Sequence, residues 1–293
     1  MKFDRFHRRK VLNLVMTALT GLTIVVILIP LIAIIYQSVV LGGAEFSVSF
    51  FTQGPPPLPV PGQATPEGGV WPAIQGTLIL VGTASIIGVP IGLGAAIFAV
   101  EYGRARTIAR LVSTTADVLA GVPSILIGIF VLEVFLTYDS AIVFSATSVS
   151  IALGILMVPI VTRGAEEALR TVPNSVREAA LALGISRWKT SIRIVFVSAL
   201  PGIITAILLA FARAAGESAI LLILAGGTYA QFTGFNNPVL GLPLLIFNFA
   251  DSPYSNLVSL AWGASLLLII MILSTSVISR FTLNRLARRM RGG

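Results

Sequence analysis

Residues 11–36 read VLNLVMTALTGLTIVVILIPLIAIIY, a stretch of 26 residues without a charged side chain. An α-helix rises about 1.5 Å per residue, so about 20 apolar residues are enough to cross about 30 Å of hydrocarbon. The apolar part of a cleaved signal peptide is shorter, about 7–15 residues, and ends at a small-residue cleavage site, which is missing here. We therefore expect residues 11–36 to form a retained first membrane-spanning helix behind a basic segment, residues 1–10.

Five further segments share this apolar character: residues 73–100, 111–136, 141–161, 200–224 and 257–279. The whole chain of 293 residues is 56% hydrophobic and 11% charged. Soluble proteins average about 45–50% apolar and about 25% charged residues, so this composition excludes a water-soluble globular protein. The sequence predicts an all-α integral membrane protein with six transmembrane helices.

The placement of the cations predicts which side of the membrane each loop faces. Nineteen of the 20 Lys and Arg residues lie in residues 2–10, 104–110, 163–193 and 280–291. The alternating segments 37–72, 137–140 and 225–256 contain none. Because cytoplasmic loops are enriched in Lys and Arg, we expect both termini to be cytoplasmic. This arrangement also accounts for the net charge of +8 without a nucleic-acid partner.

The chain divides by composition into a membrane domain and its flanking segments. Residues 37–72 hold seven of the 16 prolines and predict an extended outer loop, for docking or simple connection. The main membrane domain is expected over residues 73–281, and a basic cytoplasmic tail over residues 282–293. Within the domain, Gly88 and Gly92 form a GxxxG pair that favours close packing of helices.

The cytoplasmic segment 162–198 is the longest basic loop and contains a short helix pattern. Ser175 and Glu178 have the S-x-x-E spacing of a capping box, Ala179 and Ala180 extend the helix, and Gly184 ends it. The polar corner that follows carries Arg187 and Trp188. One interpretation is a helix that docks a partner; the alternative is an amphipathic connector resting on anionic lipid.

The twentieth cation, Arg213, lies in the middle of the fifth apolar segment. A charge at the bilayer centre is unfavourable by several kcal/mol, about 2.5–3.5 for Arg on the insertion scale, and such residues are commonly functional. Glu217 follows four residues later, on the same helical face, and can pair with Arg213. Either the pair only stabilises the structure, or Arg213 faces a translocation pathway and contacts an anion there. Asp117, inside the third segment, is a candidate partner of Arg213 or Arg163, or is hydrated near the membrane edge.

Several kinds of chemistry are excluded by the residues themselves. The chain has no cysteine and a single histidine, His7, in the basic N-terminal segment, so we expect no metal site and no catalytic residues. None of the three lysines belongs to a GxxxxGK motif, so the chain is not expected to bind or hydrolyse ATP itself. It is predicted to be no enzyme and to carry no cofactor.

Several strings, taken together, resemble a known family. Glu178-Ala-Ala180 followed by Gly184 is similar to the EAA motif of the permeases of type I ABC importers. The strings that begin at Pro159, Glu166, Gly68 and Gly121, and Arg213-Ala-Ala-Gly-Glu217, resemble the phosphate-specific subfamily. The Pro-rich outer loop and Gly241-Leu-Pro-Leu244 look more like its A-type subunits, the PstA family, than like the C-type. The resemblance covers roughly residues 68–281.

The resemblance implies a transport function and a set of partners. It implies a multi-pass subunit in the plasma (inner) membrane that translocates phosphate and forms a heterodimer with a homologous C-type permease. The loop 162–198, through Ser175, Glu178, Ala179, Ala180, Gly184, Arg187 and Trp188, would dock a dimer of ATP-binding subunits, which use ATP and Mg. An extracytoplasmic phosphate-binding protein would deliver the anion to a pathway containing Arg213, Glu217 and Asp117.

Two departures and two alternatives accompany this interpretation. The family continues past its glycine to Ile-x-Leu-Pro, where this chain has Ile194-Val-Phe-Val197, which predicts a less kinked end of the loop. It often has Gly-Glu-Thr-Ala-Pro, where this chain has Gly216-Glu-Ser-Ala-Ile220, which predicts the loss of a proline kink. The alternatives are a permease for another oxyanion and, from a different class, an ion-coupled secondary anion transporter, which would favour internal repeats.

Overall fold

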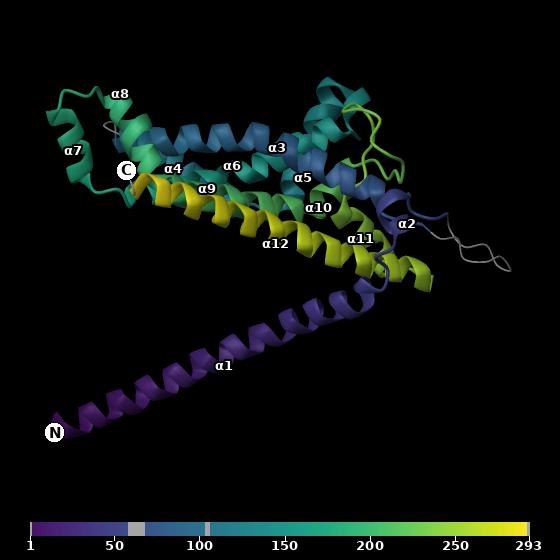
Figure 1. The fold of residues 1–293 in the computed structure, drawn as a ribbon, viewed down its shortest axis with the longest axis horizontal. Helices are drawn as coiled ribbons and strands as arrows, with labels where there is room; N and C mark the ends of the chain where they lie inside the picture. The colour runs from purple at the N-terminus through teal and green to yellow at the C-terminus, as the bar shows by residue number, and fades with distance from the viewer. Residues whose placement is uncertain (1, 58–67, 103–105, 292–293) are drawn as a thin grey trace.

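The computed structural model describes residues 2–57, 68–102 and 106–291, and the regular elements within these ranges are all helices (Figure 1). The centre of the Pro-rich loop, residues 58–67, and Arg104 lie outside the described residues. So do the side chains of residues 2–7, 106, 280 and 282–291, which include most of the two basic termini. The all-helical prediction is confirmed.

The described helices range in length from 3 to 42 residues. In chain order they are α1 (Lys2–Gly43), α2 (Val48–Thr52), α3 (Trp71–Ile97), the π-helix η1 (Phe98–Tyr102), α4 (Arg106–Ala120), α5 (Ser124–Tyr138), the 3₁₀-helix η2 (Ser140–Ile142), α6 (Ala146–Arg170), α7 (Asn174–Ala182), α8 (Arg187–Lys189), the π-helix η3 (Thr190–Val195), α9 (Phe196–Ala215), α10 (Ala219–Leu224), α11 (Leu242–Ala250) and α12 (Ser255–Arg291).

Five helical runs in the described residues are long and apolar enough to cross a membrane, and a bent pair makes a sixth. The pair is α4 and α5, which replaces the single span expected over residues 111–136 and is bent by 101° at its break. The break lies at Gly121 to Pro123, where proline lacks an N–H and has an extended ψ of 132°. The prediction of six spans therefore holds with one span sharply broken.

Close packing of α3 on α6 forms the centre of the bundle. A side chain at Gly88 would place its Cβ 2.7 Å from the carbonyl oxygen of Gly154, and one at Gly92 would lie 2.8 Å from Cβ of Val161. Both glycines of the GxxxG pair therefore face α6, as that spacing predicted. Gly82, on the same helix, has no atom within 4 Å of the position that a Cβ would occupy, and it serves no such contact.

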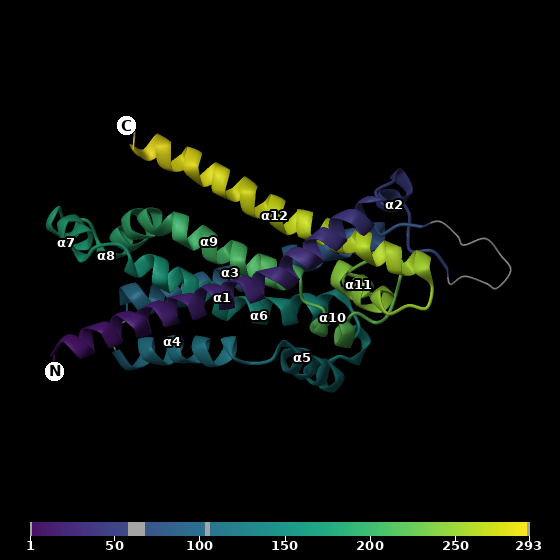
Figure 2. The same ribbon diagram turned by 90° about the horizontal axis from the view of Figure 1, so that it is seen from below.

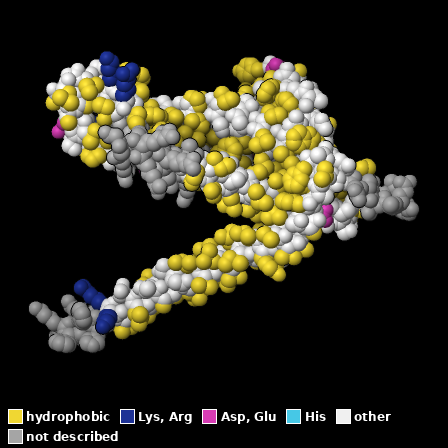
Figure 3. Space-filling view, viewed as in Figure 1, with side chains coloured by type: hydrophobic (Ala, Val, Ile, Leu, Met, Phe, Trp, Pro, Cys, Tyr) yellow, Lys and Arg dark blue, Asp and Glu magenta, His cyan; other side chains and the backbone are white. Residues whose placement is uncertain are grey.

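The two ends of the molecule differ in their charges and elements. The start of α1, the end of α12, and α7 and α8 all lie at one end, while α2, α10 and α11 lie toward the other (Figure 1; Figure 2). On the face seen in Figure 3, the described Lys and Arg side chains appear only at the first of these ends. α1 contacts α12 near its own C-terminal end, where Gly42 lies against the backbone of Trp262, and the rest of α1 diverges from the bundle.

Helices extend into both sides of the 162–198 loop. α6 continues to Arg170, beyond the expected boundary at residue 162, and helical structure runs unbroken from Arg187 to Ala215. The helical run from Arg187 to Ala215 includes the π-helix η3, and Pro201 lies inside its last part, α9.

Candidate functional site

Arg213 and Glu217 form an ion pair at the end of α9. The guanidinium Nη1 of Arg213 donates to Oε2 of Glu217 at 2.5 Å. The helix ends at Ala215 with Gly216 as its cap, so Glu217 lies in the connection to α10 rather than within a helix. The predicted i, i+4 pairing is confirmed.

The carboxylate of Glu217 joins two broken helices. Its Oε1 accepts a hydrogen bond from the hydroxyl of Ser124, at the start of α5, at 2.9 Å. The same oxygen accepts from the backbone N–H of Ala219, at the start of α10, at 3.1 Å. Ser124 therefore bonds a side-chain carboxylate. Both α5 and α10 begin directly at this carboxylate.

The break between α9 and α10 corrects the expectation that a kink is lost with the family proline. Isoleucine occupies position 220, yet the helix is interrupted from Gly216 to Ser218. The side chain of Glu217 satisfies the N–H of Ala219, which a continuous helix would have bonded internally. The interruption is therefore present without a proline at position 220.

The two partners of the ion pair differ sharply in exposure. The side chain of Glu217 is 4% exposed and that of Arg213 is 47% exposed. A cavity beside Glu217, lined also by Thr77 and Leu153, has a volume of about 10 Å³ and is large enough for one water at most. An anion as large as phosphate must therefore approach Arg213 from its exposed side, away from the core of this chain.

Asp117 lies in a different cluster and does not contact Arg213. Its carboxylate pairs with Arg163 through two contacts, Nε to Oδ1 at 2.6 Å and Nη2 to Oδ2 at 2.9 Å. Of the three possibilities raised by the sequence, the structure shows the pair with Arg163. The side chain of Asp117 is about half exposed.

A buried carboxylate in the same cluster was missed by the sequence analysis. Glu166 is 1% exposed and accepts from Arg163 at 2.9 Å, from Arg170 at 2.6 Å and from the hydroxyl of Ser113 at 3.0 Å. Its spacing to the two arginines, i−3 and i+4 on α6, was a readable signal. The cluster joins α4 to the C-terminal part of α6, which is the end predicted to face the cytoplasm.

The start of α7 differs from the predicted capping box. The helix begins at Asn174 with Pro173 as its cap residue, and no side chain caps it. Ser175 is therefore already inside the first turn and has no capping bond to Glu178. Proline, with its extended ψ of 146°, starts the helix two residues earlier than the capping-box interpretation required.

The end of α7 is as predicted. Gly184 has a φ of +77°, and its N–H donates to the carbonyl of Leu181 at 3.0 Å. The next N–H, that of Ile185, donates to the carbonyl of Ala180 at 3.1 Å. These two bonds form a Schellman motif, in which glycine adopts the left-handed conformation without steric strain.

α7 has one face toward the bundle and one toward solvent. Ala180 is buried and Val176 packs against the apolar cluster at the ends of α6 and η3. Ser175, Glu178 and Ala179 lie on the outer side and are not buried, and Leu183 and, beyond the helix, Trp188 are exposed. Exposed leucine and tryptophan beside a carboxylate make a surface suited to contact with another protein.

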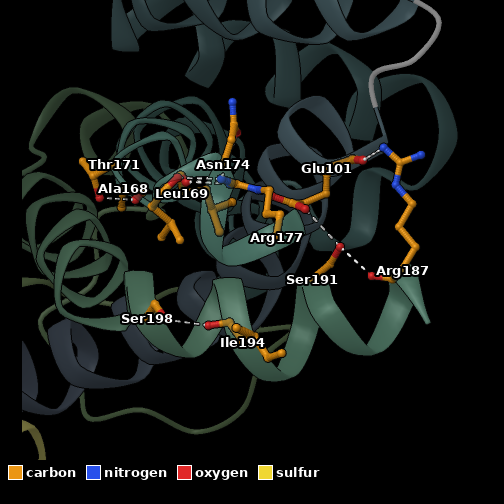
Figure 4. A network of polar contacts seen from close by, with 11 residues as sticks. Glu101, Ala168, Leu169, Thr171, Asn174, Arg177, Arg187, Ser191, Ile194 and Ser198 are labelled. Atoms are coloured by element: carbon orange, nitrogen blue, oxygen red, sulfur yellow. Dashed lines mark hydrogen bonds and ion pairs between the residues drawn. The ribbon is translucent and has the colours of Figure 1, made fainter. Parts of the chain in front are cut away.

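Arg187 is exposed and also contacts the bundle. Its Nη2 donates to the backbone carbonyl of Glu101 at 2.9 Å, and its guanidinium lies 6.0 Å from the ring centroid of Tyr102. Glu101 is itself a buried carboxylate that the sequence analysis did not select (Figure 4). Its position at the end of a long apolar segment was a signal, but its partners are distant in sequence.

Comparison with known proteins identifies one family. Residues 88–292 match the family described as "Binding-protein-dependent transport system inner membrane component". The chain is 39% identical to phosphate transport system permease protein PstA 1 of Mycobacterium tuberculosis, over 90% of this chain and 86% of that protein. It is 34% identical to PstA of Haemophilus influenzae, over 94% of this chain and 95% of that protein, and 36% identical to PstA of Yersinia pestis, over 95% and 92%.

Solved structures share the fold. A chain of the MetNI methionine ABC transporter, in an inward-facing conformation, aligns with a TM-score of 0.56 and 19% identity, covering 75% of this chain and 93% of that chain. A second crystal form of the same transporter gives a TM-score of 0.51. At this level of identity the likeness concerns the helix arrangement alone.

Proposed function

We propose that this chain, which belongs to the family of binding-protein-dependent transport system inner membrane components and to its PstA branch, is the A-type permease subunit of an ATP-driven phosphate importer. The observation that carries the proposal is the half-exposed Arg213, held by a buried Glu217 where two broken helices meet. It offers a cation for an oxyanion on the surface that a second subunit would complete.

Arg213 has the chemistry required for a transient phosphate contact. Among the described residues it bonds only through Nη1, to Glu217, so the other N–H groups of its fork are free for an anion. A guanidinium binds phosphate oxygens through paired, charge-assisted hydrogen bonds. Glu217 fixes the orientation of the guanidinium and offsets part of its charge, so that the anion is released rather than retained. Asp117 and Arg163 would border the same pathway nearer its cytoplasmic end.

The proposed complex contains this chain and three further kinds of protein. A homologous C-type permease completes the pathway, and a binding protein on the outer side delivers phosphate. Two ATP-binding subunits hold the cytoplasmic loops, with α7 and its outward-facing Glu178 and Ala179 as the contact on this chain. They use ATP and Mg, while this chain performs no covalent chemistry and needs no cofactor.

We also propose that the complex lies in the plasma membrane with both termini of this chain in the cytoplasm. The distribution of the cations supports this orientation through the positive-inside rule. The two ends of the chain and α7 lie at one end of the molecule, which is compatible with a shared cytoplasmic side (Figure 1).

Reconstitution of the complex in vesicles tests the proposed function. With the binding protein outside and ATP inside, we expect uptake of labelled phosphate that requires both and persists when ionophores collapse ion gradients. Uptake that ignores ATP and stops with the ionophore would instead identify an ion-coupled secondary transporter. Sulfate added in excess separates phosphate from other oxyanions, since a phosphate permease loses little uptake and a general oxyanion permease loses most of it.

A further inference from the structure

Glu101 lies where three parts of the 162–198 loop meet the end of α3. It belongs to the π-helix η1, which continues α3, and it is 7% exposed. Its Oε1 accepts from Nε of Arg177, on α7, at 2.9 Å, and its Oε2 accepts from the hydroxyl of Ser191, on η3, at 3.1 Å. Its backbone carbonyl accepts from Arg187, on α8 (Figure 4).

Arg177 extends this connection to the end of α6. Its Nη2 donates to the carbonyl of Leu169 at 3.0 Å, and its Nη1 donates to the carbonyl of Val172 at 2.5 Å. One guanidinium therefore joins α7, the end of α6 and, through Glu101, the end of α3. Its planar fork suits this role because its donors point in fixed directions.

Apolar packing already holds the loop against the bundle. A buried cluster that includes Ala96 of α3, Leu169 of α6 and Val195 of η3 lies beside the polar contacts, and Val176 of α7 packs on it. Buried ion pairs generally add little net stability compared with apolar residues of similar size. The polar contacts of Glu101 therefore need an explanation beyond stability. They add a hydrogen-bonded link of fixed geometry between α7 and the end of α3.

Both polar contacts of the Glu101 side chain involve π-helical segments or their neighbours. Glu101 lies in η1 and Ser191 in η3, while Arg177 of α7 bonds Glu101 alone of these two. Single-turn π-helices are rare and occur frequently at functional sites. Here the carboxylate of one π-helix, η1, bonds a hydroxyl of the other, η3. Helix geometry is therefore irregular on both sides of this contact.

We propose that Glu101 is a positioning residue that couples the docking loop to α3. When a partner moves α7, Arg177 and Glu101 transmit the displacement to α3 directly, in addition to the covalent connections to α6 and α9. α3 in turn moves α6, because Gly88 brings the two backbones into contact. This inference rests on the proposed function, since it takes an ATP-hydrolysing subunit as the partner that moves α7.

The test measures phosphate transported per ATP hydrolysed by the reconstituted complex. Glu101→Gln preserves shape and removes the charge, and Arg177→Gln removes the other partner. We expect both complexes to assemble and to hydrolyse ATP at near the wild-type rate, with a loss of at least tenfold in phosphate transported per ATP. Ser191→Ala, a milder change that leaves the ion pair intact, should lose less. Glu133→Gln, an exposed carboxylate on α5, is the matched control and should be unchanged.

A crosslink provides a rescue that a merely structural role would not show. The chain contains no cysteine, so Glu101→Cys with Arg177→Cys introduces the only two thiols. We expect low transport per ATP in this double variant, and recovery when a short bifunctional thiol reagent joins the two positions. The single cysteine variants treated with the same reagent should not recover.

The two proposals fail in different ways. Wild-type complex that takes up no phosphate with ATP overturns the proposed function. Wild-type uptake, together with an unchanged transport per ATP in Glu101→Gln, overturns the coupling role of Glu101. Loss of the ATP-hydrolysing subunit from Glu101→Gln, or a double variant that the crosslink fails to restore, also overturns it, because the pair would then only shape the docking loop.

Discussion

At the scale of single residues, the asymmetry of the Arg213–Glu217 pair separates two roles. The carboxylate is buried and receives three donors, whereas the guanidinium is half exposed and uses one of its nitrogens among the described residues. If the pair only stabilised the fold, we would expect both side chains to be buried. The exposed donors of Arg213 are therefore the part that the fold does not need and that an anion can use.

We expect Arg213→Gln to assemble with its partners and to retain ATP hydrolysis, while phosphate uptake falls at least tenfold. Ser124 and Ala219 still donate to Glu217 in this variant, so the buried carboxylate keeps part of its stabilisation. Arg213→Lys should also be impaired, because an ammonium cannot reproduce the planar fork. Folded yield, ATP hydrolysis and uptake are measured together in vesicles.

The double variant Arg213→Gln with Glu217→Gln distinguishes the two roles. If the pair served structure alone, removing both charges would restore yield and uptake that each single change had lowered. We expect no such restoration of uptake. Normal uptake in the double variant would show that phosphate passes without this pair.

At the scale of elements, α7 is a compact helix with a glycine stop and an outward face. We expect Glu178→Lys to leave the chain in the membrane but to detach the ATP-binding subunit, because a charge on the contact face is reversed. Gly184→Asp should have the same effect, since it adds a side chain and a charge where φ is +77°. Copurification of the ATP-binding subunit measures both.

Glu167→Lys is the matched control for α7. It reverses the charge of another exposed glutamate, near the end of α6 and off the α7 face. The subunit should copurify with this variant as with the wild type. If it also copurified with Glu178→Lys and uptake remained normal, the assignment of α7 as the docking element would be wrong.

The contact between α3 and α6 predicts unequal effects of two glycine substitutions on one helix. Gly88→Ala places a methyl group 2.7 Å from the carbonyl oxygen of Gly154, so we expect a lower melting temperature and lower folded yield. Gly82→Ala meets no atom within 4 Å and should be neutral or slightly stabilising, because alanine favours the helix. Equal melting temperatures for the two variants would contradict the observed packing.

At the scale of the whole molecule, the orientation in the membrane is open to a direct labelling test. We expect Ser140→Cys, an exposed position in the segment 137–140 that is predicted to lie outside, to react with an impermeant thiol reagent in intact cells. Arg9→Cys, in the basic N-terminal segment, should react only after permeabilisation. The absence of native cysteine removes background labelling. The reverse pattern would overturn the orientation.

The sequence by itself determined the class of protein and much of the ion pair. Apolar length and the placement of 19 of the 20 cations identify membrane helices and predict their orientation, because burial in lipid and positive charge near headgroups act on each segment locally. The i, i+4 spacing of Arg213 and Glu217 and the glycine stop of α7 are local in the same sense. Each depends on residues within one or two helical turns.

The tertiary structure alone decided the long-range partners and the angle of the bend between α4 and α5. The contact of Ser124 with Glu217 joins residues 93 positions apart, and that of Arg177 with Glu101 joins residues 76 apart. The bend of 101° between α4 and α5 and the break before α10 both occur beside the first of these contacts. A buried carboxylate must be satisfied by whichever donors the packing brings to it, and no local pattern specifies those donors.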